Sequence, residues 1–217
     1  MTDRISPRQF RASDGVADWR VLFDGAKAHF ATGSFSKGAE LVAAIARLAD
    51  AVNHHPNVDL RYPDVTVTLL SHDIGDISER DLALARQISD AARELGIVAE
   101  PSAVQTVQVA IDALVIPAVL PFWRAVLAYD QLGDEDVVDP HGSGPNVWFQ
   151  QMDAARPQRN RIHIDVSLPR EAAEARIAAG LAAGGRIVSD AHAPAWWTLA
   201  DPEGNEVDIA PWRDDGD

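Results

Sequence analysis

Residues 50–81, DAVNHHPNVDLRYPDVTVTLLSHDIGDISERD, contain the signals that decide the first half of the fold. Within them, residues 65–69 (VTVTL) alternate apolar and polar side chains, which is the period-two pattern of a half-buried strand. Ser78 and Asp81 then have the spacing of a capping box, so a helix is predicted to begin there and to end before Gly96. The stretch therefore predicts a strand followed by an amphipathic helix.

A hairpin and a second helix are predicted upstream of this stretch. Residues 19–32 hold two apolar runs around Asp24-Gly25, a dipeptide typical of a tight turn between antiparallel strands. Ser36 can cap the helix that follows, and Pro56 ends it, because the residue before a proline is disfavoured in the helical conformation. The apolar positions of this helix have helical spacing: Leu41, Ile45, Leu48 and Val52. This order of elements favours an α+β domain over residues 1–100, with an antiparallel sheet covered by helices on one face.

A second domain is predicted over residues 105–217. Residues 97–105 have no clear period, and a new pattern begins after them. The order strand, helix, strand, strand then occurs twice, with helices at 118–127 and 170–183. The halves share little residue identity, so the repeat is one of pattern. The whole chain is thus expected to be a two-domain α+β protein.

The composition excludes several classes of protein. With 217 residues, 47% hydrophobic and 24% charged, the chain can bury a core. Its net charge of −14 disfavours binding to nucleic acid or to anionic lipid headgroups. Cysteine is absent, and no run of about 18 apolar residues occurs, so no disulfide or membrane span is expected. We expect a cytoplasmic location.

Three histidines, His54, His55 and His72, lie within nineteen residues of one another, out of seven in the chain. Histidine is the side chain best suited to proton transfer near neutral pH, so the group is a candidate for acid/base catalysis. Two other interpretations stay open: exposed polar residues or a metal site. The metal site is the weaker of these, because no carboxylate or thiolate completes an obvious ligand set.

The first half resembles the pterin-4a-carbinolamine dehydratases, also called 4a-hydroxytetrahydrobiopterin dehydratases. The resemblance covers roughly residues 8–96 and includes the aromatic stretch 19–35. It is carried by a spaced series of residues: Asp50, His54-His55-Pro56, Tyr62, His72 and Asp81. The family often has threonine before the third histidine and an aromatic residue after the His-His-Pro segment, where this chain has Ser71 and Asn57-Val58.

The resemblance implies dehydration of a 4a-hydroxytetrahydropterin to quinonoid dihydropterin, without a metal or cofactor. It makes His54, His55 and His72 the catalytic residues, and the substrate a small-molecule pterin. Which histidine is the acid stays open, although the partial negative charge at the end of the preceding helix favours the protonated form of His54 and so its role as the acid. The resemblance also implies a homo-oligomer, a dimer or a tetramer.

Asp50, Tyr62 and Asp81 are the candidate substrate-binding residues under the same resemblance. Each also has a structural interpretation. Asp81 could simply complete the capping box of Ser78, and Asp50 could orient an imidazole or solvate a helix face. Tyr62 could stack on a pterin ring or be a half-buried strand tyrosine.

The second half resembles the glyoxalase/bleomycin-resistance, or vicinal oxygen chelate, family over roughly residues 105–213. The motifs that carry the resemblance are FWRAVL at 122–127, RIHIDV at 161–166 and DPEGNE at 201–206. It implies a pair of βαβββ modules. By position, the metal ligands of the family fall on Gln108, Gln150 or Gln151, His163 and Asp208, a set with little charge for Zn²⁺ or Fe²⁺. No metal is therefore expected, and the five tryptophans of this half are more typical of core than of a ligand cavity.

Three hypotheses for function follow. The first is a pterin dehydratase with a fused glyoxalase-like domain. The second places the chemistry in the C-terminal half, as a metal-dependent lyase, isomerase or dioxygenase. The third is a non-catalytic binding protein, since the dehydratase family includes a coactivator of a homeodomain transcription factor.

Overall fold

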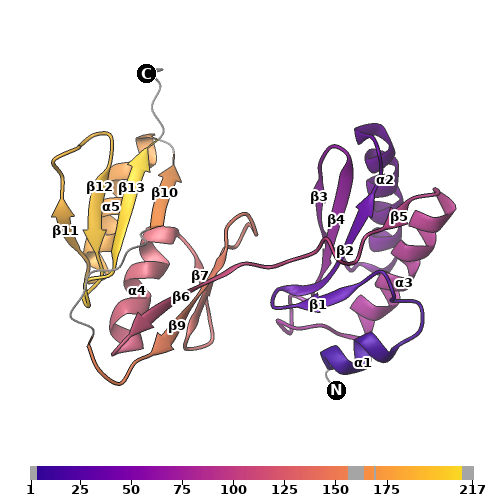
Figure 1. Ribbon diagram of the computed structural model, residues 1–217, viewed down its shortest axis with the longest axis horizontal. Coiled ribbons are helices and arrows are strands. Elements are labelled where there is room, and N and C mark those ends of the chain that lie inside the picture. The colour runs from indigo at the N-terminus through magenta and orange to yellow at the C-terminus, as the bar shows by residue number, and fades with distance from the viewer. Residues whose placement is uncertain (1–3, 156–163, 169, 212–217) are drawn as a thin grey trace. The chain divides into compact units, whose positions relative to one another are not determined.

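The computed structural model describes residues 4–155, 164–168 and 170–211 (Figure 1). The chain divides into two compact units, residues 1–106 and residues 107–217. Within the described residues, no helix is both long and apolar enough to span a bilayer.

The first unit is an antiparallel sheet with helices on one face, which confirms the predicted fold class. The sheet has the strand order β1-β2-β4-β3, and β5 pairs with β2. Figure 1 shows α2 and α3 on the same side of this sheet. The elements of this unit are α1 (Pro7–Ala12), β1 (Arg20–Leu22), β2 (Gly25–Ala31), α2 (Phe35–Val52), β3 (Asn57–Leu60), β4 (Asp64–Leu69), α3 (Glu79–Glu94) and β5 (Val98–Ala99).

Alternation along the central strands builds the core of the first unit. Val65, Val67 and Leu69 of β4 are completely buried, whereas the residues between them are half-buried on the other face. Leu41 of α2 and Ile88 of α3 are buried in the same hydrophobic cluster. The period-two and helical patterns of the sequence therefore meet in one core, as the sequence predicts.

One local prediction in this unit was wrong, and one short strand was not predicted. The cap of α2 is Ser34 rather than Ser36, since the Ser34 side chain accepts a hydrogen bond from the Lys37 backbone. The segment 97–105 also begins with the strand β5, which pairs with β2 and so belongs to the first sheet. Two residues are too few to give a periodic signal in the sequence.

The second unit is a pair of βαβββ modules, as the resemblance implies. Each module forms a four-stranded sheet whose first and last strands are parallel neighbours, in the orders β6-β9-β8-β7 and β10-β13-β12-β11. The first module comprises β6 (Gln108–Ala113), α4 (Ile116–Leu127), β7 (Asp130–Leu132), β8 (Asp136–Val138) and β9 (Asn146–Gln151). The second comprises β10 (Ile164–Leu168), η1 (Arg170–Ala172), α5 (Ala173–Ala182), β11 (Arg186–Ser189), β12 (Trp197–Ala200) and β13 (Glu206–Pro211).

The modules share one hydrophobic core, in which α4 contacts α5. Phe122 of α4 lies so close to Gly185 that a Cβ there would be 2.3 Å from two atoms of the Phe122 ring. A side chain at Gly185 would therefore force the Phe122 ring or the neighbouring backbone to move. The strands β7 and β11 were not predicted, because their residues are almost all exposed and show no alternation.

Candidate functional site

His54 points its ring into the first unit. The helix α2 ends at Val52, and Asn53 follows in the left-handed conformation, with φ of 49°. This turn reverses the chain, and the His54 backbone N–H bonds the Ala49 carbonyl at 3.1 Å. The side chain is 8% exposed, and its Nε2 lies 2.8 Å from Oδ1 of Asp81. The end of α2 thus places an imidazole against a carboxylate of α3.

Asp81 is completely buried, and both oxygens of its carboxylate accept hydrogen bonds. Besides His54, its donors are the Ser71 hydroxyl at 2.7 Å, the Ser78 backbone N–H at 2.8 Å and the Ser78 hydroxyl at 3.0 Å. The predicted capping box of Ser78 and Asp81 is present. The predicted contact of Asp81 with substrate does not match this burial, since its oxygens are occupied by protein donors. Its carboxylate instead orients the His54 ring.

The bond to Asp81 decides which nitrogen of His54 can meet a substrate. An ionised carboxylate only accepts hydrogen bonds, so Nε2 carries the proton and Nδ1 is left over. Nδ1 has no hydrogen-bond partner among the described residues. Every fully buried side-chain nitrogen or oxygen of these residues does have a partner, so Nδ1 cannot be one of the buried atoms. Nδ1 therefore keeps contact with solvent, although the His54 side chain as a whole is largely buried.

His72 directly follows Ser71, whose hydroxyl bonds Asp81. It occupies an exposed turn over 72–75, closed by the Ser71 N–H bond to the Asp76 carbonyl at 3.0 Å. Since Ser71 bonds one Asp81 oxygen and His54 the other, the structure brings the turn of His72 close to the His54 ring. Within the described chain, the His72 side chain has no hydrogen-bond or ion-pair partner.

Asp73, which follows His72, is paired with Arg80 of α3. Arg80 donates to its carboxylate at 2.8 and 3.1 Å, and this bond is the main cause that lowers the pKa of Asp73. The charge of His54 lowers the same pKa more weakly. The Arg80 bond ties the turn to the first turn of α3, next to Asp81.

His55 and Asp50 form a surface pair rather than part of the buried network. His55 Nε2 lies 3.0 Å from Oδ1 of Asp50, and the two side chains are 56% and 76% exposed. Asp50 thus contacts His55, in keeping with its predicted option of orienting an imidazole. Both residues remain accessible at the end of α2 from which the His54 ring turns inward.

Tyr62 is not brought to the histidines. It is 72% exposed in the turn between β3 and β4. The neighbouring Pro63 carbonyl accepts the N–H groups of Thr32 and Gly33, just before the start of α2. His54 instead follows the end of α2, whose 18 residues rise about 27 Å. Neither predicted setting of Tyr62, against the pterin or half-buried in a strand, matches this position within one chain.

The positions of the second unit that correspond to the family's metal ligands, where no metal was expected, do not form a metal site among the described residues. Gln108 pairs with Asn146 and Gln150 with Asp112, so the two glutamines lie at opposite ends of β6 and β9, about 13 Å apart along the strands. Gln151 instead donates to the backbone carbonyls of Leu114 and Met152. Asp208 accepts from the Thr198 hydroxyl at 2.6 Å, and His163 lies outside the described residues. Among the residues that the structure describes, no three His, Asp or Glu side chains form a metal-binding group.

The motif residues of the second unit hold its two modules together. Asp201 is completely buried and accepts from the Trp123 indole at 3.0 Å, from the Glu203 and Asn205 backbone N–H groups, both at 2.9 Å, and from the Asn205 amide at 2.8 Å. The Glu203 carboxylate accepts the Leu114 and Val115 N–H groups at 2.7 Å, at the start of α4. These roles were missed from the sequence, where the spacing of DPEGN gave no sign of contacts with α4.

Comparisons with known proteins divide the chain at the same place. Residues 4–91 match the family described as "Pterin 4 alpha carbinolamine dehydratase", and residues 108–210 match "Glyoxalase-like domain". A relative from Nocardia farcinica, named "Putative pterin-4-alpha-carbinolamine dehydratase", is 36% identical over 93 residues, which cover 42% of this chain and 98% of that protein. Both halves thus match the families that the sequence resembles.

Two solved structures are similar in part. A protein from Brucella melitensis, described as "transcriptional coactivator/pterin dehydratase", has 27% identity and a TM-score of 0.37, covering 41% of this chain and 98% of that one. A glyoxalase-related enzyme from Fulvimarina pelagi has 15% identity and a TM-score of 0.41, covering 50% of this chain and 88% of that one.

Proposed function

Because the chain belongs to the pterin-4a-carbinolamine dehydratase family through its N-terminal half, we propose that this half removes water from a 4a-hydroxytetrahydropterin. The observation that carries the proposal is the His54–Asp81 pair, which occupies Nε2 of His54 and leaves Nδ1 without a protein partner among the described residues, near the exposed turn of His72. A dehydratase-like role is supported by the family match and by the relatives' names.

The reaction needs two proton transfers at neighbouring atoms of the substrate. The bond between C4a and the hydroxyl oxygen breaks, and the oxygen leaves as water after receiving a proton. N5 loses its proton, and the electron pair of that N–H bond forms the N5=C4a double bond of quinonoid dihydropterin. One group must therefore accept a proton while another donates one.

The geometry favours His54 as the group that accepts the proton. With Nε2–H directed at Asp81, Nδ1 offers a lone pair, and the buried carboxylate stabilises the imidazolium that forms. This differs from the acid role that the helix end suggested, because Asp81 is the group bonded to the ring. His72 in its protonated form then supplies the proton for the departing hydroxyl, and His55 remains a pterin-contacting residue.

We predict that His72→Ala lowers kcat for dehydration by about 100-fold, because a general acid contributes about 10²- to 10⁴-fold. His72 is exposed and has no partner among the described residues, so the free energy of unfolding is expected to stay within about 0.5 kcal/mol of wild type. Formation of quinonoid dihydropterin by the full chain measures the rate. The exposed His141 of the second unit provides a control, His141→Ala. Equal rates in both variants would remove His72 from the proposal.

No specific observation favours metal chemistry in the C-terminal half: Gln108 and Gln150 are separated along β6 and β9, and no three His, Asp or Glu side chains of the described residues form a metal-binding group. The residues present do not fit the metal set of the vicinal oxygen chelate family. The oligomeric state, the physiological pterin and the cytoplasmic location stay predictions.

A further inference from the structure

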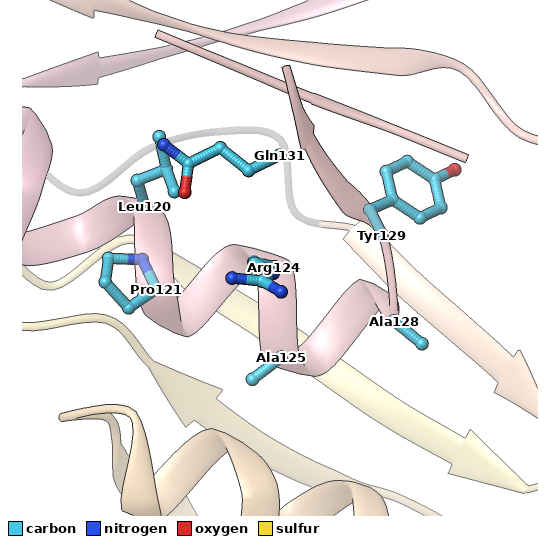
Figure 2. A pocket seen from close by; sticks show the side chains of 7 residues that line it. All are labelled: Leu120, Pro121, Arg124, Ala125, Ala128, Tyr129 and Gln131. Atoms are coloured by element: carbon cyan, nitrogen blue, oxygen red, sulfur yellow. The ribbon is translucent and has the colours of Figure 1, made fainter. Parts of the chain in front are cut away.

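A pocket of about 350 Å³ lies in the second unit, between the outer side of α4 and the start of β7 (Figure 2). Its walls are aliphatic side chains of α4 and the ring of Tyr129, and its polar side chains include Arg124 and Gln131. In Figure 2 the Arg124 side chain is seen between Leu120 and Tyr129. The pocket thus combines an apolar lining with one cationic group.

Arg124 is not engaged by the protein itself. Within the described residues, no carboxylate pairs with it, although the chain has 33 acidic and 19 basic residues. An arginine in the last turn of a helix often donates hydrogen bonds to the free backbone carbonyls at that end. In α4 other groups already bond these carbonyls. The Arg176 side chain donates to the Val126 carbonyl at 2.9 Å, and the Tyr129 backbone N–H donates to the Arg124 carbonyl at 3.1 Å. The end of α4 therefore does not require the Arg124 guanidinium.

From this pocket we propose that the second unit binds a small monocarboxylic acid with an aliphatic or aromatic body, through Arg124. A guanidinium can bind a carboxylate with two parallel hydrogen bonds, and the apolar walls fit the hydrocarbon part. The partial negative charge at the end of α4 disfavours a dianion, so a carboxylate fits better than a phosphate. This site is separate from the proposed dehydration.

The neighbouring polar groups agree with an organic acid. Gln131 donates one amide N–H to the Gly133 carbonyl at 2.8 Å, which leaves its second amide N–H to donate to a carboxylate ligand. Burial, and more weakly the charge of Asp139, raises the pKa of Tyr129, so its phenol stays neutral and repels no anion. A volume of about 350 Å³ lies at the small end of ligand pockets, which limits the acid to a small one.

Titration of the full chain with phenylacetate, followed by NMR of backbone amides, tests the proposal. We expect saturable shifts in the residues that line the pocket, and binding weaker by about tenfold or more in Arg124→Gln. The matched control is Arg47→Gln, a change of an exposed arginine in the middle of α2, which should leave the affinity unchanged.

Two comparison ligands separate the chemistry. Phenylacetamide has the same body without the charge and should bind at least about tenfold more weakly, and inorganic phosphate should not saturate the site at the same concentrations. Three results would overturn the proposal: no saturable binding of phenylacetate, equal binding by Arg124→Gln, or phosphate or the amide binding as tightly as the acid.

Discussion

Replacing Asp81 by asparagine is expected to lower the rate of dehydration by about 10²- to 10⁴-fold. The side chain keeps its shape, but its amide nitrogen is now a donor placed among four donors: His54, the Ser71 and Ser78 hydroxyls and the Ser78 N–H. If the amide donates to His54 Nε2, that nitrogen must lose its proton and Nδ1 must carry it. The lone pair then points at the protein rather than at the substrate.

If Asp81 only stabilised the fold, Asp81→Asn would change the stability of the first unit but not the pH profile of kcat. The experiment therefore measures stability and the pH profile as well as the rate. Hydrogen exchange of peptides from α3 and β4 in the full chain measures folding of the first unit, for which we expect a loss of about 2 kcal/mol. The pH profile of kcat should lose the limb that belongs to the base. Asp90→Asn changes an exposed carboxylate of the same helix, paired with Arg93, and should alter neither quantity. A wild-type rate and pH profile in Asp81→Asn would contradict the orienting role.

Replacing Asp201 by alanine is expected to destabilise the second unit by about 3 kcal/mol or more. Four donors lose their common acceptor, and the Trp123 indole is left buried without a partner. The turn that carries Glu203 also loses two of its bonds, which weakens the hold of the Glu203 carboxylate on the two residues just before α4. Denaturant unfolding followed by tryptophan fluorescence measures the loss, since five of the six tryptophans belong to this half.

The same variant shows whether the units depend on each other. Each unit has its own hydrophobic cluster, so we expect Asp201→Ala to keep the wild-type rate of dehydration under conditions where the second unit remains folded. Asp190→Ala, a change of an exposed carboxylate between β11 and β12, is the control for fluorescence and should unfold like wild type. Unchanged stability of Asp201→Ala would show that the buried network is not what holds α4.

The sequence predicts the main elements of both units because their patterns are local. Alternation in residues 65–69, the capping box at Ser78 and the paired modules could all be found without knowing a single distant contact. The exposed strands β7 and β11 could not, because a strand without a buried face has no alternation to detect.

The candidate site shows the same division between local and distant information. The series His54, His55 and His72 is visible as a motif, but the contact between His54 and Asp81 joins residues 27 positions apart. The sequence offered two roles for Asp81, a capping box and contact with substrate, and neither of them is the bond to His54. Tyr62 shows the reverse case: the motif places it beside the histidines in the chain, and α2 separates it from them in space.

The double duty of Asp81 also affects how relatives of this protein should be classified. A relative that does not act on pterins would still need this carboxylate to begin α3 and to satisfy two buried serines. Its presence in a genome sequence therefore says little about retained enzyme activity. The His72 side chain bonds no other group of the described fold, so a relative that has lost the activity can replace this histidine without losing stability. The residue at position 72 is therefore the better one for separating active enzymes from inactive relatives in sequence comparisons.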